Sequence, residues 1–311
     1  MRSIVPGPTR RQLQVGLGLV WLIDAALQFQ PYMFSHRFGT DVIAMAAQGQ
    51  PYALASLVRA VAWVIGWAPG VANAVFATVQ LGLGIGLLRR RWAGLALRGT
   101  VVWSLGVWCF GEAMGGVLSG HASLLTGAPG AALLYLLVAA AAWVGRESDM
   151  DRPVSERVLV GWAVVWGVGA LLQGLPGQAS PGALAGVFTA AGQAGPGWLD
   201  PLDRLVAGWA GAGGGLSLAV VIALEASLAA AVFAGPVVAR GAAVVGAVVA
   251  VAMWGLGQGF GLMFSGQSTD PNSGPLLVLL AGAVYSWARN AAQPARSDRS
   301  PLEPGPQLQP V

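Results

Sequence analysis

The sequence predicts an all-α membrane protein with eight transmembrane helices, arranged as two parallel four-helix repeats with short amphipathic outer helices. Three observations predict this fold class: the composition, the length of the uncharged segments and an internal repeat. Hydrophobic residues make up 55% of the 311 residues and charged residues only 10%, whereas about a quarter of an ordinary soluble domain is charged. Nearly uncharged segments of about 17–25 residues recur, and each is long enough to cross a bilayer as a helix.

The eight expected spans follow these uncharged segments along the chain. They lie at about residues 13–30, 71–88, 99–117, 130–145, 158–174, 213–234, 239–263 and 275–288. We expect the first to be a retained span and not a signal peptide, because Asp24, Gln28 and Gln30 lie near its end without a small-residue cleavage pattern. None of the spans shows a strong internal break beyond Gly.

Two long segments, about residues 31–70 and 175–212, connect spans on the outer side. Residues 51–67 have apolar side chains at helical spacing around Arg59, and residues 201–210 repeat this pattern around Arg204. Each pattern predicts a short amphipathic helix that lies at the outer interface or dips into the bundle.

The repeat has a period of 145–146 residues and includes the polar residues inside the apolar segments. The matched pairs are Trp21 with Trp166, Gln28 with Gln173, Arg59 with Arg204, Gln80 with Glu225, Trp108 with Trp254, Glu112 with Gln258, Ser119 with Ser265, and Pro129 with Pro275. Because each repeat has an even number of spans, the two repeats share one orientation, related by a pseudo-twofold axis along the membrane normal. The matched stripes are then able to line a shared cavity. The repeat is imperfect where Asp24 faces Gly169 and His121 faces Gln267.

The distribution of Arg sets the expected orientation. All 17 basic residues are Arg, and only Arg37, Arg59 and Arg204 fall on the side opposite to the others. The positive-inside rule then places both termini in the cytoplasm, and we expect a multi-pass protein of the bacterial plasma membrane. The excess of basic residues reflects this topology, so no nucleic-acid partner is expected. The expected domains are a cytoplasmic N-terminus (1–12), a first four-helix repeat (13–146), a cytoplasmic linker (147–157), a second four-helix repeat (158–289) and a disordered cytoplasmic tail (290–311).

Polar side chains inside the spans predict a cleft that handles a ligand or protons. A charged residue at a helix centre facing lipid costs roughly 2.5–3.5 kcal/mol, so such residues should face the protein interior. The candidate cleft residues are Asp24, Gln28, Gln80, Glu112, His121, Gln173, Glu225 and Gln258. The alternative for Gln80, Gln173 and Gln258 is an interhelical hydrogen bond that only fixes packing.

Further candidates lie toward the outer side. Arg59 and Arg204 are expected to form an outer gate or to face an anion, and the alternative is a position at the lipid headgroups. Outer turns begin at Ser119 and Ser265, and Asp270 belongs to the second turn, which is dense in turn-forming residues. His121 stands alone, so no metal site is expected. It is also a candidate to carry protons with Glu112, nine residues earlier on the same helix.

One stretch of the chain resembles the four-helix DoxX-type membrane proteins. It begins at Gln80 and reads Gln-Leu-Gly-Leu-Gly-Ile-Gly-Leu-Leu-Arg-Arg-Arg-Trp-Ala-Gly-Leu-Ala-Leu, and Glu225 matches the usual acid of the family in the second copy. The resemblance implies two fused DoxX-like units over about residues 13–288. It also implies a quinone-facing or complex-anchoring role, because DoxX-type proteins are linked to quinone-dependent thiosulfate oxidation and membrane-bound redox complexes. The extended outer loops, Gln80 and the outer turns depart from the family, and the turns look like those of uncharacterised actinobacterial membrane proteins.

Three functions remain open from the sequence. The first is a redox-associated membrane subunit that binds quinone in a polar cleft or anchors a complex. The second is a transporter or channel for a small solute or cation, with its site at the repeat interface. The third is a scaffold whose outer loops dock a redox or extracytoplasmic protein partner. The sequence shows no nucleophile–base set, phosphate loop, or ligands for haem, flavin or iron–sulfur clusters, so we do not expect an enzyme that acts on its own.

Overall fold

The computed structural model describes residues 9–143, 151–180 and 182–292, and within these ranges the chain is helical without β-strands. The expected N-terminus up to residue 8, residues 147–150 of the expected linker and the tail from residue 293 lie outside the described residues. The helices of the N-terminal half are α1 (Arg10–Gln28), α2 (Tyr52–Trp67), α3 (Pro69–Leu88), α4 (Arg90–Gly106) and α5 (Ala131–Ala141). The helices of the C-terminal half are α6 (Arg157–Gln173), α7 (Ala183–Ala194), α8 (Asp200–Gly213), α9 (Gly215–Ala231), α10 (Pro236–Ala252) and α11 (Ser273–Ala291).

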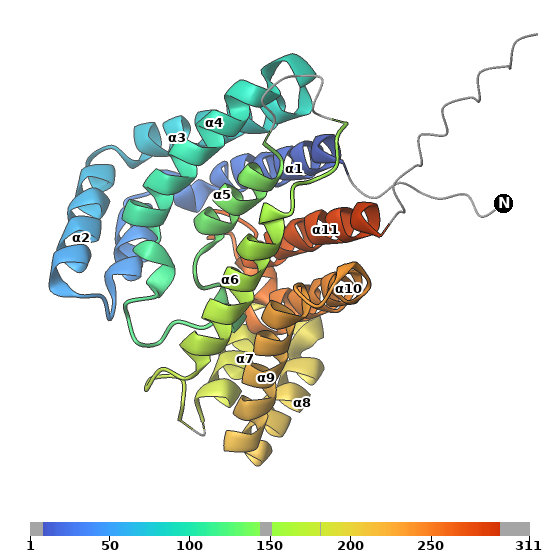
Figure 1. The fold of residues 1–311 in the computed structure, drawn as a ribbon. Coiled ribbons are helices and arrows are strands. Elements are labelled where there is room, and N and C mark those ends of the chain that lie inside the picture. The colour runs from blue at the N-terminus through green and yellow to red at the C-terminus, as the bar shows by residue number, and fades with distance from the viewer. Residues whose placement is uncertain (1–8, 144–150, 181, 293–311) are drawn as a thin grey trace, which may run out of the picture.

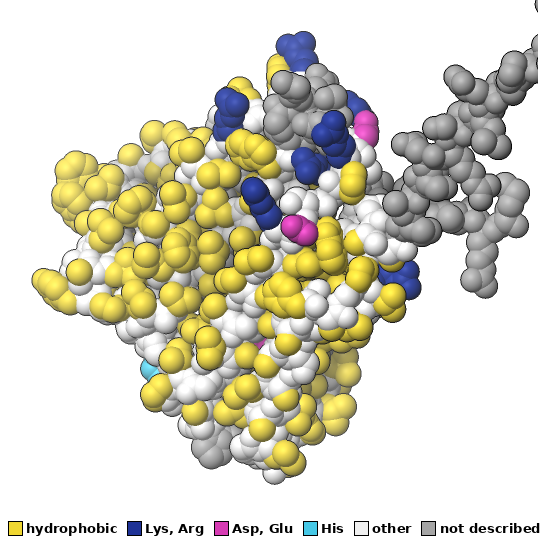
Figure 2. Space-filling model, in the orientation of Figure 1, with side chains coloured by type: hydrophobic (Ala, Val, Ile, Leu, Met, Phe, Trp, Pro, Cys, Tyr) yellow, Lys and Arg dark blue, Asp and Glu magenta, His cyan; other side chains and the backbone are white. Residues whose placement is uncertain are grey.

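Three helical stretches are long and apolar enough to cross a membrane. They are Pro69–Leu88, Arg90–Gly111 and Pro236–Gly257. A fourth candidate is the pair Gly197–Gly213 and Gly215–Ala231, which bends by 108°. Much of the surface of these elements is apolar, and hydrophobic side chains cover most of the face drawn in Figure 2. A large exposed apolar surface is typical of a protein that contacts lipid.

The other expected spans are shorter or more polar in the structure. Helix α5 has 11 residues, which rise only about 16 Å at 1.5 Å per residue. Helix α6 has 17 residues, and α1 carries Arg10, Arg11 and Asp24. The outer segments contain helices α2 and α8 at the expected places, and also α7, which the sequence reading missed. Its Gly-Gln-Ala-Gly-Pro ending resembles a loop more than a helix.

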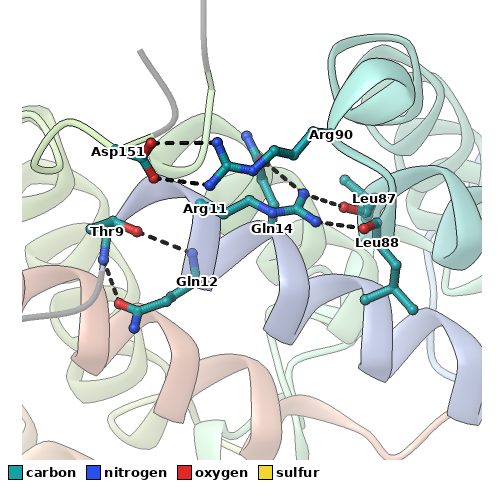
Figure 3. A network of polar contacts seen from close by, with 8 residues as sticks. All are labelled: Thr9, Arg11, Gln12, Gln14, Leu87, Leu88, Arg90 and Asp151. Atoms are coloured by element: carbon teal, nitrogen blue, oxygen red, sulfur yellow. Dashed lines mark hydrogen bonds and ion pairs between the residues drawn. The ribbon is translucent and has the colours of Figure 1, made fainter. Parts of the chain in front are cut away.

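A polar network joins the N-terminus of α1 to the C-terminus of α3 (Figure 3). Thr9 and Gln12 form a capping box at the start of α1. The guanidinium of Arg11 donates to the carbonyl oxygens of Leu87 and Leu88, which are unpaired at the C-terminus of α3. Arg90 forms an ion pair of 3.3 Å with Asp151. Arg side chains therefore gather at this end of the molecule, as Figure 2 also shows near the α3–α4 turn.

The two halves pack in the same way and meet at α5, α6 and α11. Helix α1 packs on α3 in the N-terminal half, and α6 packs on α9 in the C-terminal half. Helix α5 packs on α4, and α11 packs on α10. Helix α11 also contacts α1, α5 and α6, so it lies in the middle of the molecule (Figure 1).

Both halves contain the same break in a long helix. Helix α4 continues as the π-helix η4 (Val107–Gly111), and α10 continues as the π-helix η9 (Met253–Gly257). Left-handed residues follow each π-helix. They are Ala113, Met114, Gly115 and Gly116 after η4, and Gly259, Phe260, Gly261 and Leu262 after η9. The expected spans 99–117 and 239–263 are thus interrupted, and Gly alone is not the cause, because non-Gly residues also take left-handed conformations.

Each break is held by the same hydrogen bond. The indole of Trp108 donates to the carbonyl oxygen of Pro129 at 2.8 Å, and that of Trp254 donates to Pro271 at 2.6 Å. The structural counterpart of Pro129 is therefore Pro271 and not Pro275, because the outer turn after Ser265 is four residues shorter than the turn after Ser119.

Candidate functional site

The N-terminal half encloses a cavity of about 510 Å³. Its walls come from α1, α3, α4 with η4, and α5, and from the outer segments at η2 (Phe38–Ile43) and α2. The turn that carries Thr269 and Asp270, in the C-terminal half, completes the wall. Most lining side chains are apolar or aromatic. The polar ones are Asp24, Gln28, Gln80, Ser104, Glu112, Tyr135, Thr269 and Asp270, with the indoles of Trp21 and Trp103.

Asp24 lies on the buried face of α1 and is only 1% exposed. The hydroxyl of Tyr135, on α5, donates to its Oδ2 atom at 2.5 Å. The ring of Trp21 stacks on Tyr135 with 4.1 Å between the centroids, and its indole donates to Thr100 on α4 at 3.2 Å. These contacts hold the Asp24 carboxyl in one orientation and leave its Oδ1 atom without a hydrogen-bond donor among the described residues.

Glu112 lies directly after the π-helix η4 and reaches the beginning of α5. The backbone N–H of Ala132 donates to its Oε1 atom at 3.0 Å. This N–H is one of the unpaired donors at a helix N-terminus, where a carboxylate is favourable. Its Oε2 atom has no donor in the described part of the chain. Gly130 allows this approach, because a Cβ atom there would lie 2.2 Å from Oε2.

Asp270 is the third carboxyl of the cavity and comes from the other half. The backbone N–H of Asn272 donates to its Oδ1 atom at 2.8 Å, and the hydroxyl of Thr269 donates to Oδ2 at 2.8 Å. Burial raises the pKa of this carboxyl, and the two hydrogen bonds oppose the shift only in part. No Arg or His lines the described cavity, so three acids share it without a basic partner.

The unpaired polar atoms of the cavity are mostly acceptors. Besides Asp24 and Glu112, the side-chain oxygens of the buried Gln28 and Gln80 have no donor among the described residues. Two donors without partners, the indole N–H of Trp103 and the hydroxyl of Ser104, also line the cavity. Buried polar atoms are nearly always hydrogen-bonded in native proteins, so these are the atoms that ordered water or a bound molecule would pair with.

The cavity reaches the apolar surface beside α4. Two of its lining residues, Val102 and Phe110, are 73% and 44% exposed. They belong to the candidate span Arg90–Gly111, so this side of the cavity faces the region where lipid would lie.

The structure separates the other expected cleft residues from this cavity. In the C-terminal half the amide of Gln173 lies 3.4 Å from the carboxylate of Glu225, and that of Gln258 donates to Ser273 at 2.7 Å. Neither pair is among the residues lining the cavity. The candidate cleft therefore lies inside the N-terminal half, and the two halves do not contribute equal numbers of residues to its walls.

The expected outer residues also lie elsewhere. Arg59 and Arg204 are exposed, and neither lines the cavity. The hydroxyls of Ser119 and Ser265 accept the backbone N–H of the residue two positions later, which is His121 and Gln267 respectively, so both serine side chains stabilise turns. His121 is exposed and does not share a helix with Glu112, because the helix ends at Gly111. The expectation that His121 and Glu112 lie on one helix is therefore wrong.

Each half inserts its outer turn into the other half. Thr269 and Asp270 of the C-terminal half line the N-terminal cavity. The counterpart in the N-terminal half is the turn η6 (Leu124–Thr126), which contacts α6 and η9. Leu124 lies against Gly169, where a Cβ atom would be 2.7 Å from its Cδ2 atom. Leu124 and the carboxylate of Glu225, whose Oε2 atom would be 3.3 Å from the same Cβ, therefore both lie close to Gly169, the residue that the repeat aligns with Asp24.

Several site residues were not anticipated from the sequence. Tyr135 is the clearest, and its signal was a single phenol inside an otherwise aliphatic helix. Trp103 and Ser104 precede the π-helix and gave no distinct signal. Among the described residues there is no group of three or more His, Cys, Asp or Glu side chains suited to a metal ion. Comparisons with protein-family models, with curated proteins and with solved structures find no match.

Proposed function

We propose that the chain is an eight-span protein of the bacterial plasma membrane, built from two parallel four-helix repeats that resemble DoxX-type units, with both termini in the cytoplasm. The repeated π-helix, left-handed turn and Trp-to-Pro hydrogen bond support the duplication. The Arg cluster around the α1 and α3 ends supports the orientation. The buried irregular segment before α5 fits a membrane protein, because non-helical backbone is tolerated at membrane depth where protein covers it.

Labelling of single cysteines tests this topology in a Cys109→Ala background. His121→Cys and Gln267→Cys should react with a membrane-impermeant maleimide in intact cells. Arg91→Cys and Ala234→Cys, which are exposed positions at the other end, should react only after permeabilisation. Reaction of one half with the opposite sidedness would contradict parallel repeats.

The function that the geometry supports best is the transport of a small amphipathic organic solute, which enters the N-terminal cavity from the bilayer. The observation that carries this proposal is the cavity of about 510 Å³ with apolar walls, convergent polar groups and exposed lining residues on α4. Small-molecule sites are commonly cavities of roughly 300–1,000 Å³ with such a lining. Broken helices beside a polar site near the membrane centre are also frequent in secondary transporters.

Purification in mild detergent, followed by mass spectrometry of the bound small molecules, tests this function. A small organic molecule should co-purify with the wild type and should be depleted in Asp24→Asn. Glu225→Gln is the matched control, because it changes a buried carboxyl that does not line the cavity. Proteoliposomes should then take up the identified molecule. A protein that carries nothing and moves nothing would contradict the proposal.

The second candidate is a redox-associated subunit that binds quinone, as the DoxX resemblance implies. The unpaired donors Trp103 and Ser104 favour it, because a quinone carbonyl accepts hydrogen bonds. The unpaired carboxylate and amide oxygens favour the transporter, because they need hydrogen-bond donors and a quinone carbonyl only accepts hydrogen bonds. A quinone in the mass spectrum, lost in Trp103→Phe, would favour the redox role.

A further inference from the structure

We propose that the N-terminal cavity selects a primary or secondary ammonium group carried on an apolar or aromatic body. This inference rests on the proposed small-molecule function and names the chemical class of the solute. Three independent features of the cavity support it: its charge, its unpaired atoms and its aromatic walls.

The first feature is the charge balance. Asp24, Glu112 and Asp270 line one cavity, and no basic side chain lines it in the described part of the chain. Buried carboxylates need a counter-charge or must remain protonated. A cationic solute provides the counter-charge, whereas an anionic one adds a fourth negative group.

The second feature is the type of atom left unpaired. Asp24 Oδ1, Gln28 Oε1, Gln80 Oε1 and Glu112 Oε2 all accept hydrogen bonds and lack a donor among the described residues. Asp24 and Gln28 are almost completely buried, so binding of the head group requires a small rotation of their side chains toward the cavity. A primary ammonium carries three N–H donors and a secondary one carries two. A quaternary ammonium carries none and leaves the oxygens unpaired.

The third feature is the aromatic wall. Rings from Trp21, Phe38, Phe76, Trp103 and Phe110 surround the same space. Aromatic faces attract cations, and the attraction is stronger where water is excluded. They also pack against an apolar body. The solute therefore combines a charged head at the acids with a hydrophobic part toward the exposed side at Val102 and Phe110.

A matched series of naphthyl probes tests the head group on the full chain in detergent. The probes are naphthylethylamine, its N-trimethyl form, naphthylethanol and naphthylacetate, and binding is followed by calorimetry. Naphthylethylamine should bind at least about tenfold more tightly than each of the others, the effect expected from charge-assisted hydrogen bonds.

The variants locate the binding. Asp24→Asn and Asp270→Asn should each weaken naphthylethylamine binding about tenfold and leave naphthylethanol binding unchanged, which a collapsed cavity would not do. If Asp24→Asn fails to fold, Asp270→Asn, in a turn, still gives the test. Glu225→Gln should bind both probes as the wild type does, because Glu225 lies outside the cavity.

The outcomes separate this inference from the proposed function. If no probe binds, the small-molecule function itself fails. If the neutral or anionic probe binds as tightly as the amine, the ammonium assignment is overturned and the small-molecule function stands. If the trimethyl form binds as tightly as the amine, recognition through N–H donors is overturned.

Discussion

In the N-terminal half, α1 presents Asp24 to a cavity that a polar turn completes, whereas in the C-terminal half α6 presents Gly169 to the side chain of Leu124. The surrounding frame is the same in both halves: a π-helix, left-handed residues and an indole bonded to a proline carbonyl. The difference therefore lies in a few side chains and in the inserted turn, which is four residues shorter after Ser265 than after Ser119. The frame surrounds a polar cavity in the N-terminal half, whereas in the C-terminal half Leu124 and the buried Glu225 lie beside Gly169.

This comparison also explains why the two halves depend on each other. The N-terminal cavity takes Asp270 from the other half, and the core of the C-terminal half takes Leu124 in return. Neither half has a complete interior alone, so we expect the two to fold as one unit.

The shared frame gives the largest expected effect. Gly115 has φ +64°, and a Cβ atom there would lie 1.8 Å from the carbonyl oxygen of Pro129. Gly261 has φ +66°, and a Cβ atom there would lie 2.5 Å from the carbonyl carbon of Pro271. Because backbone atoms cannot move aside, Gly115→Ala and Gly261→Ala should each lower the free energy of unfolding by about 3 kcal/mol or more. Gly116→Ala, at φ +75° in open space, should lose only about 1 kcal/mol. Thermal unfolding in detergent measures all three, and equal losses at Gly115 and Gly116 would contradict the close approach.

The packed core of the C-terminal half gives the next effect. Leu124 is 0% exposed, and Leu124→Ala should lower the free energy of unfolding by about 2–5 kcal/mol through lost contacts and a new void. The control is Leu95→Ala on α4, because Leu95 is 73% exposed and should change stability by no more than about 0.5 kcal/mol. If Leu124→Ala is as stable as Leu95→Ala, the turn does not fill the C-terminal half.

The two indole hydrogen bonds test whether the helix breaks after α4 and α10 are stabilised alike. Trp108→Phe and Trp254→Phe each remove the N–H that pairs with a proline carbonyl and keep an aromatic ring. Each should lower the free energy of unfolding by about 1–2 kcal/mol. A loss in one variant alone would show that the two breaks are not stabilised alike.

The smallest expected effect concerns pH and Asp270. Burial raises the pKa of this carboxyl from its ordinary value of 3.8, so the folded state holds the proton more tightly than the unfolded state. Relative to Asp270→Asn, the wild type should therefore lose stability as the pH rises above 3.8 toward the raised pKa. Asp24, Glu112 and Tyr135 face Asp270 in the same cavity, so comparison of the melting temperatures of the two proteins at each pH reports Asp270 together with its electrostatic coupling to these three groups. A wild type that gains on the variant with rising pH would show that the ion, and not the acid, is stabilised.

Part of the candidate site could be predicted from the sequence. The cost of placing polar side chains inside the membrane predicted Asp24, Gln28, Gln80 and Glu112, and the composition of the turn predicted Asp270. All five residues line one cavity in the structure. The same reasoning included Glu225, because a buried carboxyl gives the same signal whether it lines a cavity or packs beside Gln173. Position along the chain cannot separate these two cases.

The remaining differences come from tertiary contacts. The breaks after Gly106 and Ala252 depend on indole bonds to prolines 21 and 17 residues away, which helical periodicity does not reveal. The exchange of turns places Leu124 beside Gly169 and Asp270 in the N-terminal cavity. Repeat alignment predicted two equivalent stripes, but it could not show which inserted side chain would fill one of them.

Photolabelling decides whether the solute binds in the N-terminal half alone. A naphthylethylamine that carries a diazirine is bound to the full chain, irradiated and mapped by mass spectrometry of the peptides. We expect the diazirine to label peptides from α1, from α4 with η4, or from α5, and excess unlabelled amine should suppress this labelling. Saturable labels on α6, α9 or η9 instead would contradict it.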